Sequence, residues 1–228
     1  LKSYFLQGAY KKGNTFLKAL AFGGYERGYQ SWFGLTKDQI KENRRQNPYT
    51  YENEIDNYKQ DHYQIHLNQK LNSNWSINVG LNYTYGRGYY EQFREDDDIS
   101  TYGGIVVSDV DSNGDELGTT DVIRRRWLDN NFYVLNTTFN YVSSKLNMNF
   151  SSYYSSYSGD HYGEVIWARQ IGLNNSIRDE YYRGNGKKNE WSLFAKSSFL
   201  LTDALEIFGD LQFRKIGYKT TGLTSDLV

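Results

Sequence analysis

The sequence predicts an all-β fold in which antiparallel strands run up and down and form a segment of a transmembrane β-barrel. Three observations support this prediction. Residues 63–71 and 75–85 alternate apolar and polar side chains on both sides of a short turn, which is typical of strands with one apolar face. Four such hairpins follow one another and are joined by long segments. The 228 residues include 22 Tyr, 12 Phe and 5 Trp, and aromatic side chains gather at both water interfaces of membrane barrels.

Each predicted hairpin consists of two strands and a short turn that is rich in Gly, Asn, Ser or Asp, the usual turn formers. The predicted strand pairs are residues 2–10 with 15–26, 57–71 with 75–93, 127–142 with 146–157, and 190–201 with 205–220. Strand 15–26 is ambiguous, because both of its faces carry apolar residues.

The predicted connections between hairpins are long, and they comprise residues 27–56, 94–126 and 158–189. Connections of this length are uncommon inside a compact soluble domain. A strict alternation of short turns and long loops is typical of outer-membrane barrels. The mean hydropathy of −0.77 and the lack of any apolar run of 18 residues exclude membrane-spanning helices. A membrane barrel is compatible with both observations, because its interior and its loops are polar.

Composition and spacing exclude several other classes of function. The net charge of −1 indicates no nucleic-acid partner. His62, His66 and His161 lack the spacing of a metal site, and no nucleophile or paired-carboxylate pattern is present. We therefore expect neither an enzyme nor a cofactor.

Six stretches that span nearly the whole chain carry a resemblance to a known family. They are residues 57–64, 87–93, 123–133, 159–169, 180–188 and 208–214. In these stretches the chain resembles an internal part of the barrel of TonB-dependent outer-membrane receptors of Gram-negative bacteria. The resemblance implies a barrel of about 22 strands, of which this chain supplies about eight. It also implies import of a scarce ligand: a siderophore, a cobalamin-like cofactor or an oligosaccharide.

The resemblance further implies where the chain works and what it contacts. The location is the cell outer membrane. The partners are outer-membrane lipid, the remainder of the barrel with its plug, the TonB complex and a small-molecule or oligosaccharide ligand. Residues 1–4 already read as a strand and residues 220–228 resemble the start of a loop. We therefore expect residues 1–228 to be one partial barrel domain without a signal peptide or plug.

Candidate ligand-binding residues lie in or near the predicted loops. They are Trp32, Tyr49, Tyr51, Tyr89, Tyr90, Arg124, Arg125, Arg126, Trp167, Arg169 and Tyr181. Exposed aromatic rings can stack on sugars or siderophore rings, or they can pack the loops together, which we favour. The arginine run can hold an anionic ligand, or it can pair with Asp129 or with the acidic run at residues 95–98, and both interpretations stay open.

Two acidic segments are weaker candidates for cation binding. Asp109, Asp111 and Asn113 match the first half of a calcium loop, but Thr120 stands where the pattern needs a bidentate Glu. We favour a turn capped by Asx side chains, and we favour a solvated loop for residues 95–98.

Two alternative functions remain at this point. One is a soluble or surface β-sandwich that binds carbohydrate through Tyr and Trp side chains. The other is a porin-type barrel. An apolar stripe that faces lipid distinguishes the membrane proteins from the soluble one.

Overall fold

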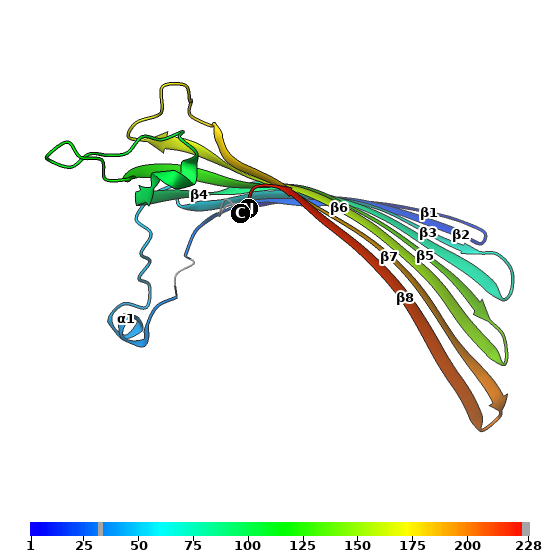
Figure 1. Cartoon of the computed structure of the whole chain (residues 1–228). Coiled ribbons are helices and arrows are strands. Elements are labelled where there is room, and N and C mark those ends of the chain that lie inside the picture. Colours follow the sequence, from blue (N-terminus) through cyan, green and yellow to red (C-terminus); the bar gives the residue numbers. More distant parts are fainter. Residues whose placement is uncertain (32–33, 225–228) are drawn as a thin grey trace.

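Eight strands form one continuous antiparallel sheet, in which each strand pairs with the next in chain order (Figure 1). This computed structural model describes residues 1–31 and 34–224. The elements are β1 (Lys2–Lys12), β2 (Thr15–Tyr29), α1 (Lys37–Glu42), β3 (Ile55–Lys70), β4 (Trp75–Asp98), η1 (Ile99–Tyr102), β5 (Thr119–Val142), β6 (Leu146–Ala168), β7 (Glu180–Thr202) and β8 (Leu205–Gly222). The predicted antiparallel up-and-down fold with four hairpins is confirmed.

The strands extend further toward the long loops than predicted. The connection between β4 and β5 contains only residues 99–118, so the predicted loop at 94–126 is wrong at both of its ends. The connection between β6 and β7 contains only residues 169–179. A strand is recognisable from alternating residues only where one of its faces is apolar. The backbone hydrogen bonds between strands continue further, where both faces of the sheet meet water or loops. The sequence pattern therefore stops before the strands do.

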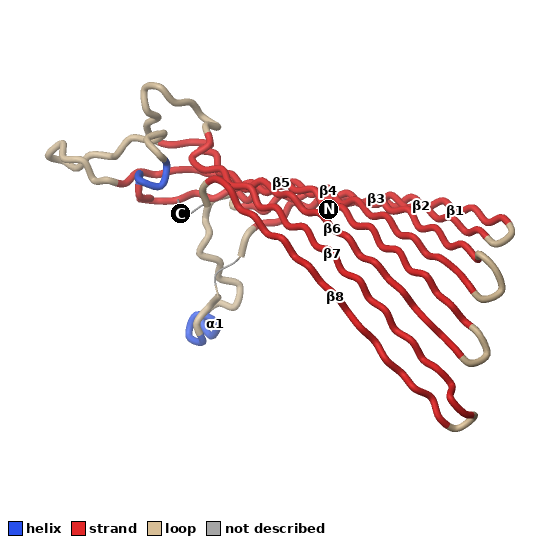
Figure 2. Tube along the Cα trace, turned by 45° about the vertical axis from the view of Figure 1, so that its right-hand side comes forward, coloured by secondary structure: helices blue, strands red, loops and turns tan. Residues whose placement is uncertain are grey.

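The short turns and the long connections lie at opposite ends of the sheet (Figure 2). In the first turn, Gly13 has a φ of 54°, a left-handed conformation that glycine adopts without steric cost. In the second, Oδ1 of Asn72 accepts the backbone N–H groups of Asn74 and Trp75, both at 2.9 Å. Local turn chemistry thus fixes the register of each hairpin.

The register places alternate residues on two faces. Ile65, Leu81 and Leu135 are direct cross-strand partners on one face, which we call the outer face because an apolar face points outward in a membrane barrel. Gln64 and Asn82 are partners on the opposite face, which we call the inner face. Adjacent residues of one strand therefore have different surroundings throughout the sheet.

The same register resolves the ambiguous strand β2. Ala19 lies opposite Ile65 and belongs to the outer face. Phe22 lies opposite His62 on the inner face, where the two rings stack with their centroids 4.6 Å apart. The ring of His62 on β3 thus covers Phe22 on the inner face of β2.

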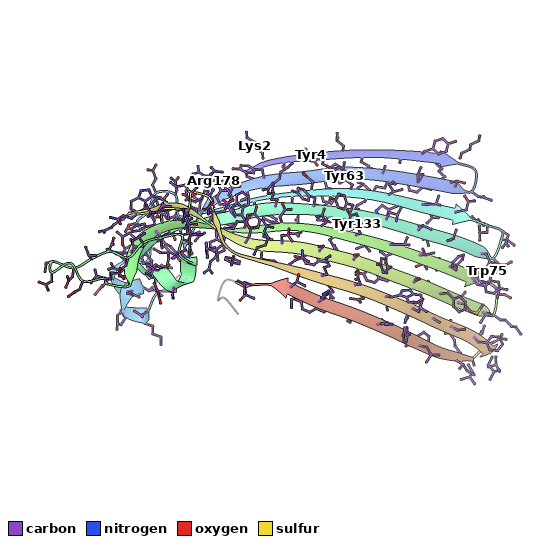
Figure 3. All side chains as sticks on the ribbon, turned by 45° about the horizontal axis from the view of Figure 1, so that its top comes forward. Lys2, Tyr4, Tyr63, Trp75, Tyr133 and Arg178 are labelled. Atoms are coloured by element: carbon purple, nitrogen blue, oxygen red, sulfur yellow. The ribbon has the colours of Figure 1, made fainter. Side chains whose placement is uncertain are left out.

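Aromatic side chains form two rows on the outer face. Near the short turns, the rings of Trp75 and Tyr141 have their centroids 5.0 Å apart. Further along the strands, Tyr83 stacks between Tyr63 and Tyr133, with centroids 6.0 and 4.7 Å away. Figure 3 labels Tyr63 and Tyr133 in this part of the sheet and Trp75 near the short turns. Two aromatic rows therefore flank the apolar residues between them on the outer face.

Trp191 adds an aromatic ring to the outer face of β7. It lies in the middle of that strand, which begins at Glu180, and it stands opposite Tyr154.

The described residues form a single sheet, and no second sheet packs on it. Leu81, Ile65 and Leu211 remain 47%, 48% and 79% exposed on the outer face. A sandwich requires two sheets packed face to face, so the soluble sandwich alternative does not match this architecture. No helix in the described part of the chain has the length and apolarity needed to cross a membrane.

A cluster of buried apolar side chains lies at the loop end of the sheet. Tyr102 of η1 is fully buried there against Val122 of β5, Val165 of β6 and Tyr181 of β7. These residues belong to the inner face, so η1 and residues 105–106 lie over that face. Backbone hydrogen bonds, such as that from Gly172 N to Ile105 O at 2.9 Å, join this segment to the next loop.

Candidate functional site

The alternation of β5 divides the three arginines between two faces of the sheet. Arg124 and Arg126 lie on the inner face, opposite Gln92 and Tyr90 of β4. Arg125 lies between them on the outer face. Because side chains alternate along a strand, the three arginines do not form one basic patch. Each arginine therefore has its own partners.

Arg124 holds η1 in place. Its Nη1 donates to Oδ2 of Asp97 and to Oη of Tyr102, both at 3.2 Å. Its Nη2 donates to Oε1 of Gln92 at 3.4 Å. The side chain is only 7% exposed, and its Nε has no partner among the described residues. This arginine therefore pairs with the acidic run at residues 95–98, as one of the two sequence interpretations expected, and it is not accessible to a ligand.

Arg126 keeps hydrogen-bond donors available on the inner face. Its Nε donates to Oη of Tyr181 and its Nη1 donates to Oη of Tyr90, both at 3.3 Å. No hydrogen bond joins Nη2 to another described residue, although a guanidinium carries five N–H donors. Tyr182 packs edge-on against Tyr181, with the ring centroids 5.0 Å apart. We call Tyr90, Arg126, Tyr181 and Tyr182 the inner cluster.

The members of the inner cluster differ in exposure. Tyr181 and Tyr182 are each 6% exposed, whereas Arg126 and Tyr90 are half-buried. Burial raises the pKa of Tyr181, so its hydroxyl stays protonated at neutral pH. Buried tyrosines thus support an arginine that presents positive charge to the inner face.

Four other candidates belong to the outer face or to the loop beside it. Nε of Arg125 donates to Oε2 of Glu91 at 2.7 Å, and its guanidinium carbon lies 4.3 Å from the ring centroid of Tyr89. Oη of Tyr51 donates to the other oxygen of Glu91 at 2.7 Å, and burial together with this hydrogen bond raises the pKa of Tyr51 to about 12. Trp167 borders a surface hollow of about 410 Å³. The other residues of that hollow are Thr50, Tyr51, Phe93 and Ile123. These side chains do not face the interior of a barrel.

Arg169 connects three segments at the loop end. Its Nη2 donates to Oδ2 of Asp121 at 2.6 Å, and its Nε lies 3.5 Å from Oδ2 of Asp109. Asp121 also accepts the backbone N–H of Asp96 at 3.0 Å, where a φ of 47° interrupts β4. The Asp96 N–H and then Arg169 hold the pKa of Asp121 below its usual range. This candidate ligand-binding arginine is therefore already paired with two carboxylates.

The half-calcium-loop motif forms a capped turn. Oδ1 of Asp111 accepts the backbone N–H groups of Asp115 at 2.9 Å and of Asn113 at 2.7 Å, and these bonds lower the pKa of Asp111. Asp109 faces Arg169 instead. Over residues 1–31 and 34–224, no group of three or more His, Asp or Glu side chains could hold a metal ion. This geometry is that of the Asx turn favoured from the sequence.

Two candidates come from the segment between β2 and β3. Tyr49 is half-buried, and its carbonyl accepts a hydrogen bond from Oη of Tyr29 at 2.9 Å. Burial, followed by the charge of Glu54, raises the pKa of Tyr49. Trp32 lies outside the described residues.

Sequence reasoning missed an aromatic ladder on the outer face above the tyrosine row. Trp127 lies between Tyr89 and Tyr162, with centroids 4.6 and 5.8 Å away. The guanidinium carbon of Arg183 lies 4.2 Å from the ring centroid of Tyr162. These rings meet only when the pairing of residues across strands is known, and part of the ladder lies in a segment that was predicted as a loop. Alternation within one strand therefore did not reveal it.

Comparisons with known proteins agree with this architecture at the level of fold. No family model matches the chain, and no curated protein matches its sequence. Among solved structures, it is similar to the crystal structure of the ferric-catecholate import receptor Fiu from E. coli K12 in its open form. The TM-score is 0.61 at 12% identity, and the alignment covers 97% of this chain and 38% of that receptor. The chain thus spans about two fifths of the length of this structure, and the likeness shows that they share a fold.

Proposed function

We propose that this chain forms part of the barrel wall and the extracellular end of a TonB-dependent import receptor in the outer membrane of a Gram-negative bacterium. One observation carries the proposal: a single antiparallel sheet has an apolar outer face, and its inner face ends in a cluster of arginine and tyrosines. The similar solved structure is an import receptor. Residues 1–228 are then a partial barrel domain, and further barrel strands, the plug and the segment that contacts TonB belong to other parts of the receptor.

The dimensions of the outer face support a membrane position. Trp75 and Tyr83, which mark the two aromatic rows, are eight residues apart on β4. Eight residues extend about 26 Å along a strand, or about 19 Å along the membrane normal at a tilt of about 45°. The apolar band of an outer-membrane barrel is about 25 Å tall and is flanked by aromatic girdles. Lipid would also cover apolar side chains such as Ile65, which is 48% exposed in the middle of the sheet.

The inner cluster supports an anionic ligand. Arg126 presents unused donors on the inner face, and the hydroxyl of Tyr90 lies beside them. A planar guanidinium binds oxyanions through two parallel hydrogen bonds. Of the ligand classes that the sequence left open, a negatively charged ferric siderophore fits this chemistry better than a neutral oligosaccharide. The receptor of similar fold imports a ferric catecholate.

Two neighbouring arginines provide a matched test in the full-length receptor. Arg126→Gln removes the charge from the inner face, and Arg125→Gln removes the same charge from the outer face. A hydrogen bond to a charged group contributes about 1.5–3 kcal/mol, which corresponds to roughly 10- to 150-fold in affinity. We expect Arg126→Gln to weaken ferric-siderophore binding by that factor and Arg125→Gln to leave it nearly unchanged. Binding is measured by titration in detergent, and uptake by radiolabelled iron in cells.

Several results would count against the proposal. Equal effects of the two substitutions would show that the inner face has no special role in ligand binding. Uptake that continues without the TonB complex and without Arg126 would instead indicate a porin-type barrel. Urea unfolding of both variants serves as the control that each protein remains folded.

A further inference from the structure

A β-bulge beside the inner cluster places two consecutive tyrosines on one face of β7. Tyr182 lies opposite Gly163 of β6. The next pair in the ladder joins Glu164 to Glu180, so Tyr181 is the extra residue of the bulge. The rings of Tyr181 and Tyr182 both pack on the inner face, with their centroids 5.0 Å apart, whereas regular alternation would send one of them to the outer face. Bulges re-aim side chains in this way and are frequent beside functional sites.

The backbone of β6 makes room for both rings at Gly163. A Cβ at this position would overlap ring carbons of Tyr181 and of Tyr182. Gly163 is also the direct cross-strand partner of Arg126 on β5. A side chain here would therefore push the two rings away from the arginine, and glycine within a strand marks such a close approach.

The ring of Tyr181 is held by two neighbouring rings. Tyr102 of η1 packs edge-on against it, with the centroids 4.9 Å apart, and Tyr182 packs edge-on as well. Tyr181 is only 6% exposed. A ring with so little freedom keeps its hydroxyl in one place, and this hydroxyl accepts the Nε–H of Arg126 at 3.3 Å.

The position of this hydroxyl determines which donors of Arg126 remain for an anion. A guanidinium offers two forks of paired N–H groups, one formed by Nε with Nη2 and one formed by Nη1 with Nη2. Tyr181 binds Nε and thereby closes the first fork. Tyr90 binds one of the two N–H groups of Nη1, so the second fork keeps N–H groups on both nitrogens. An anion with two oxygens therefore meets the end of the guanidinium.

We propose that Tyr181, presented by the bulge and by Gly163, is a positioning residue that fixes Arg126 so that it binds the oxygens of an anionic ligand end-on. This inference rests on the proposed function, because it takes Arg126 as the ligand-binding group. It goes beyond that function by assigning roles to a bulge and to a glycine that touch no ligand. Without this support, the long arginine side chain would have to be ordered at the moment of binding, which weakens affinity.

The test is a double-mutant cycle in the full-length receptor in detergent. Tyr181→Phe keeps the ring and removes only the hydroxyl that accepts the Nε–H. Arg126→Lys keeps the positive charge but has no fork to orient. Binding of an anionic ferric tris-catecholate is titrated for the native receptor, for both single variants and for the double variant.

Tyr181→Phe should lower the affinity by about 2- to 10-fold, which corresponds to ordering one long side chain on binding. In the Arg126→Lys background, the same substitution should have almost no effect. A tyrosine that only packs the sheet would cause the same loss in both backgrounds, and that result overturns the inference. An unchanged affinity of the Tyr181→Phe receptor overturns it as well.

Two glycines of β6 provide a matched steric test of the bulge. They lie four residues apart on the inner face, where Gly163 is opposite Arg126 and Gly159 is opposite Asn130. A Cβ on Gly159 would overlap Tyr157, which lies outside the inner cluster.

Gly163→Ala should lose at least as much affinity as Tyr181→Phe, and Gly159→Ala should bind as the native receptor does. Equal affinities of the two alanine variants would contradict the role of Gly163. Urea unfolding shows whether each variant is folded, and the double-mutant cycle decides the matter if Gly163→Ala does not fold.

The Arg126→Gln variant separates this inference from the proposed function. If Arg126→Gln weakens binding and Tyr181→Phe does not, only the positioning role fails. If Arg126→Gln leaves binding unchanged, the inner cluster is not the ligand site, and the proposed ligand fails together with this inference.

Discussion

Leu81 provides the most direct test of the membrane position of the outer face. It lies six residues from Trp75, which is about 20 Å along β4 and about 14 Å along the normal at a 45° tilt. This lies inside the apolar band, about 5 Å along the normal below the aromatic row at Tyr83. Leu81 is 47% exposed and lies between Ile65 and Leu135. An arginine at this position would face hydrocarbon between the two aromatic rows.

Leu81→Arg should therefore destabilise the folded receptor by about 1–3 kcal/mol, between the cost of an arginine at the bilayer midplane and its cost near the interface. That cost lowers the equilibrium constant for folding by about 5- to 150-fold. Asn82→Arg is the matched control, because the neighbouring side chain points to the inner face. We expect it to change stability by less than about 1 kcal/mol.

The assay is urea-dependent folding of the full-length receptor into lipid vesicles, followed by tryptophan fluorescence and by the altered gel mobility of the folded barrel. The reasoning is refuted if the two substitutions have equal effects. It is also refuted if Leu81→Arg yields a folded, water-soluble monomer in the absence of lipid, which is the result that a soluble protein would give.

Two other predictions concern close packing and pH. Gly88→Val should cost about 1–3 kcal/mol in urea unfolding, because its Cβ would clash with the carbonyl oxygen of Asn57. Gly80→Val on the same strand is the control and should cost much less, because the nearest atom to its Cβ would be 3.6 Å away. The lowered pKa of Asp121 means that its stabilising contacts persist above the unfolded-state pKa of about 3.9 and are lost as the pH falls through the lower folded-state value. Residues 99–118 should therefore be cleaved faster by an acid-active protease at pH 3 than at pH 5, and Asp121→Asn should increase cleavage at pH 5. Cleavage that is independent of both changes would contradict this role.

The strands and their faces near the short turns were predictable because the signal is local. The pattern through Ile65, Leu67 and Leu81 requires only that side chains alternate along a chain. The turn at Asn72 was predictable for the same reason, since its side chain bonds to the backbone two and three residues later. These features do not depend on contacts with the rest of the chain.

The candidate site was predictable in composition but not in arrangement. Arg126, Tyr90 and Tyr181 were all candidate ligand-binding residues, and the structure brings them into hydrogen-bond contact from three strands. Arg124 and Arg169 were candidates for the same role, but their guanidinium groups meet carboxylates. Which arginine remains available depends on partners that are distant in sequence.

The sequence alone determined the hairpins, the two faces and the aromatic rows, because each depends on residues a few positions apart. Only the tertiary structure decided how far β4 and β5 extend, since their upper parts are held by ladder hydrogen bonds and interrupted by bulges after Arg94 and Ile123. It also decided that η1 packs on the inner face, where Tyr102 is buried by three strands. These outcomes depend on contacts between segments, which no pattern within one strand records.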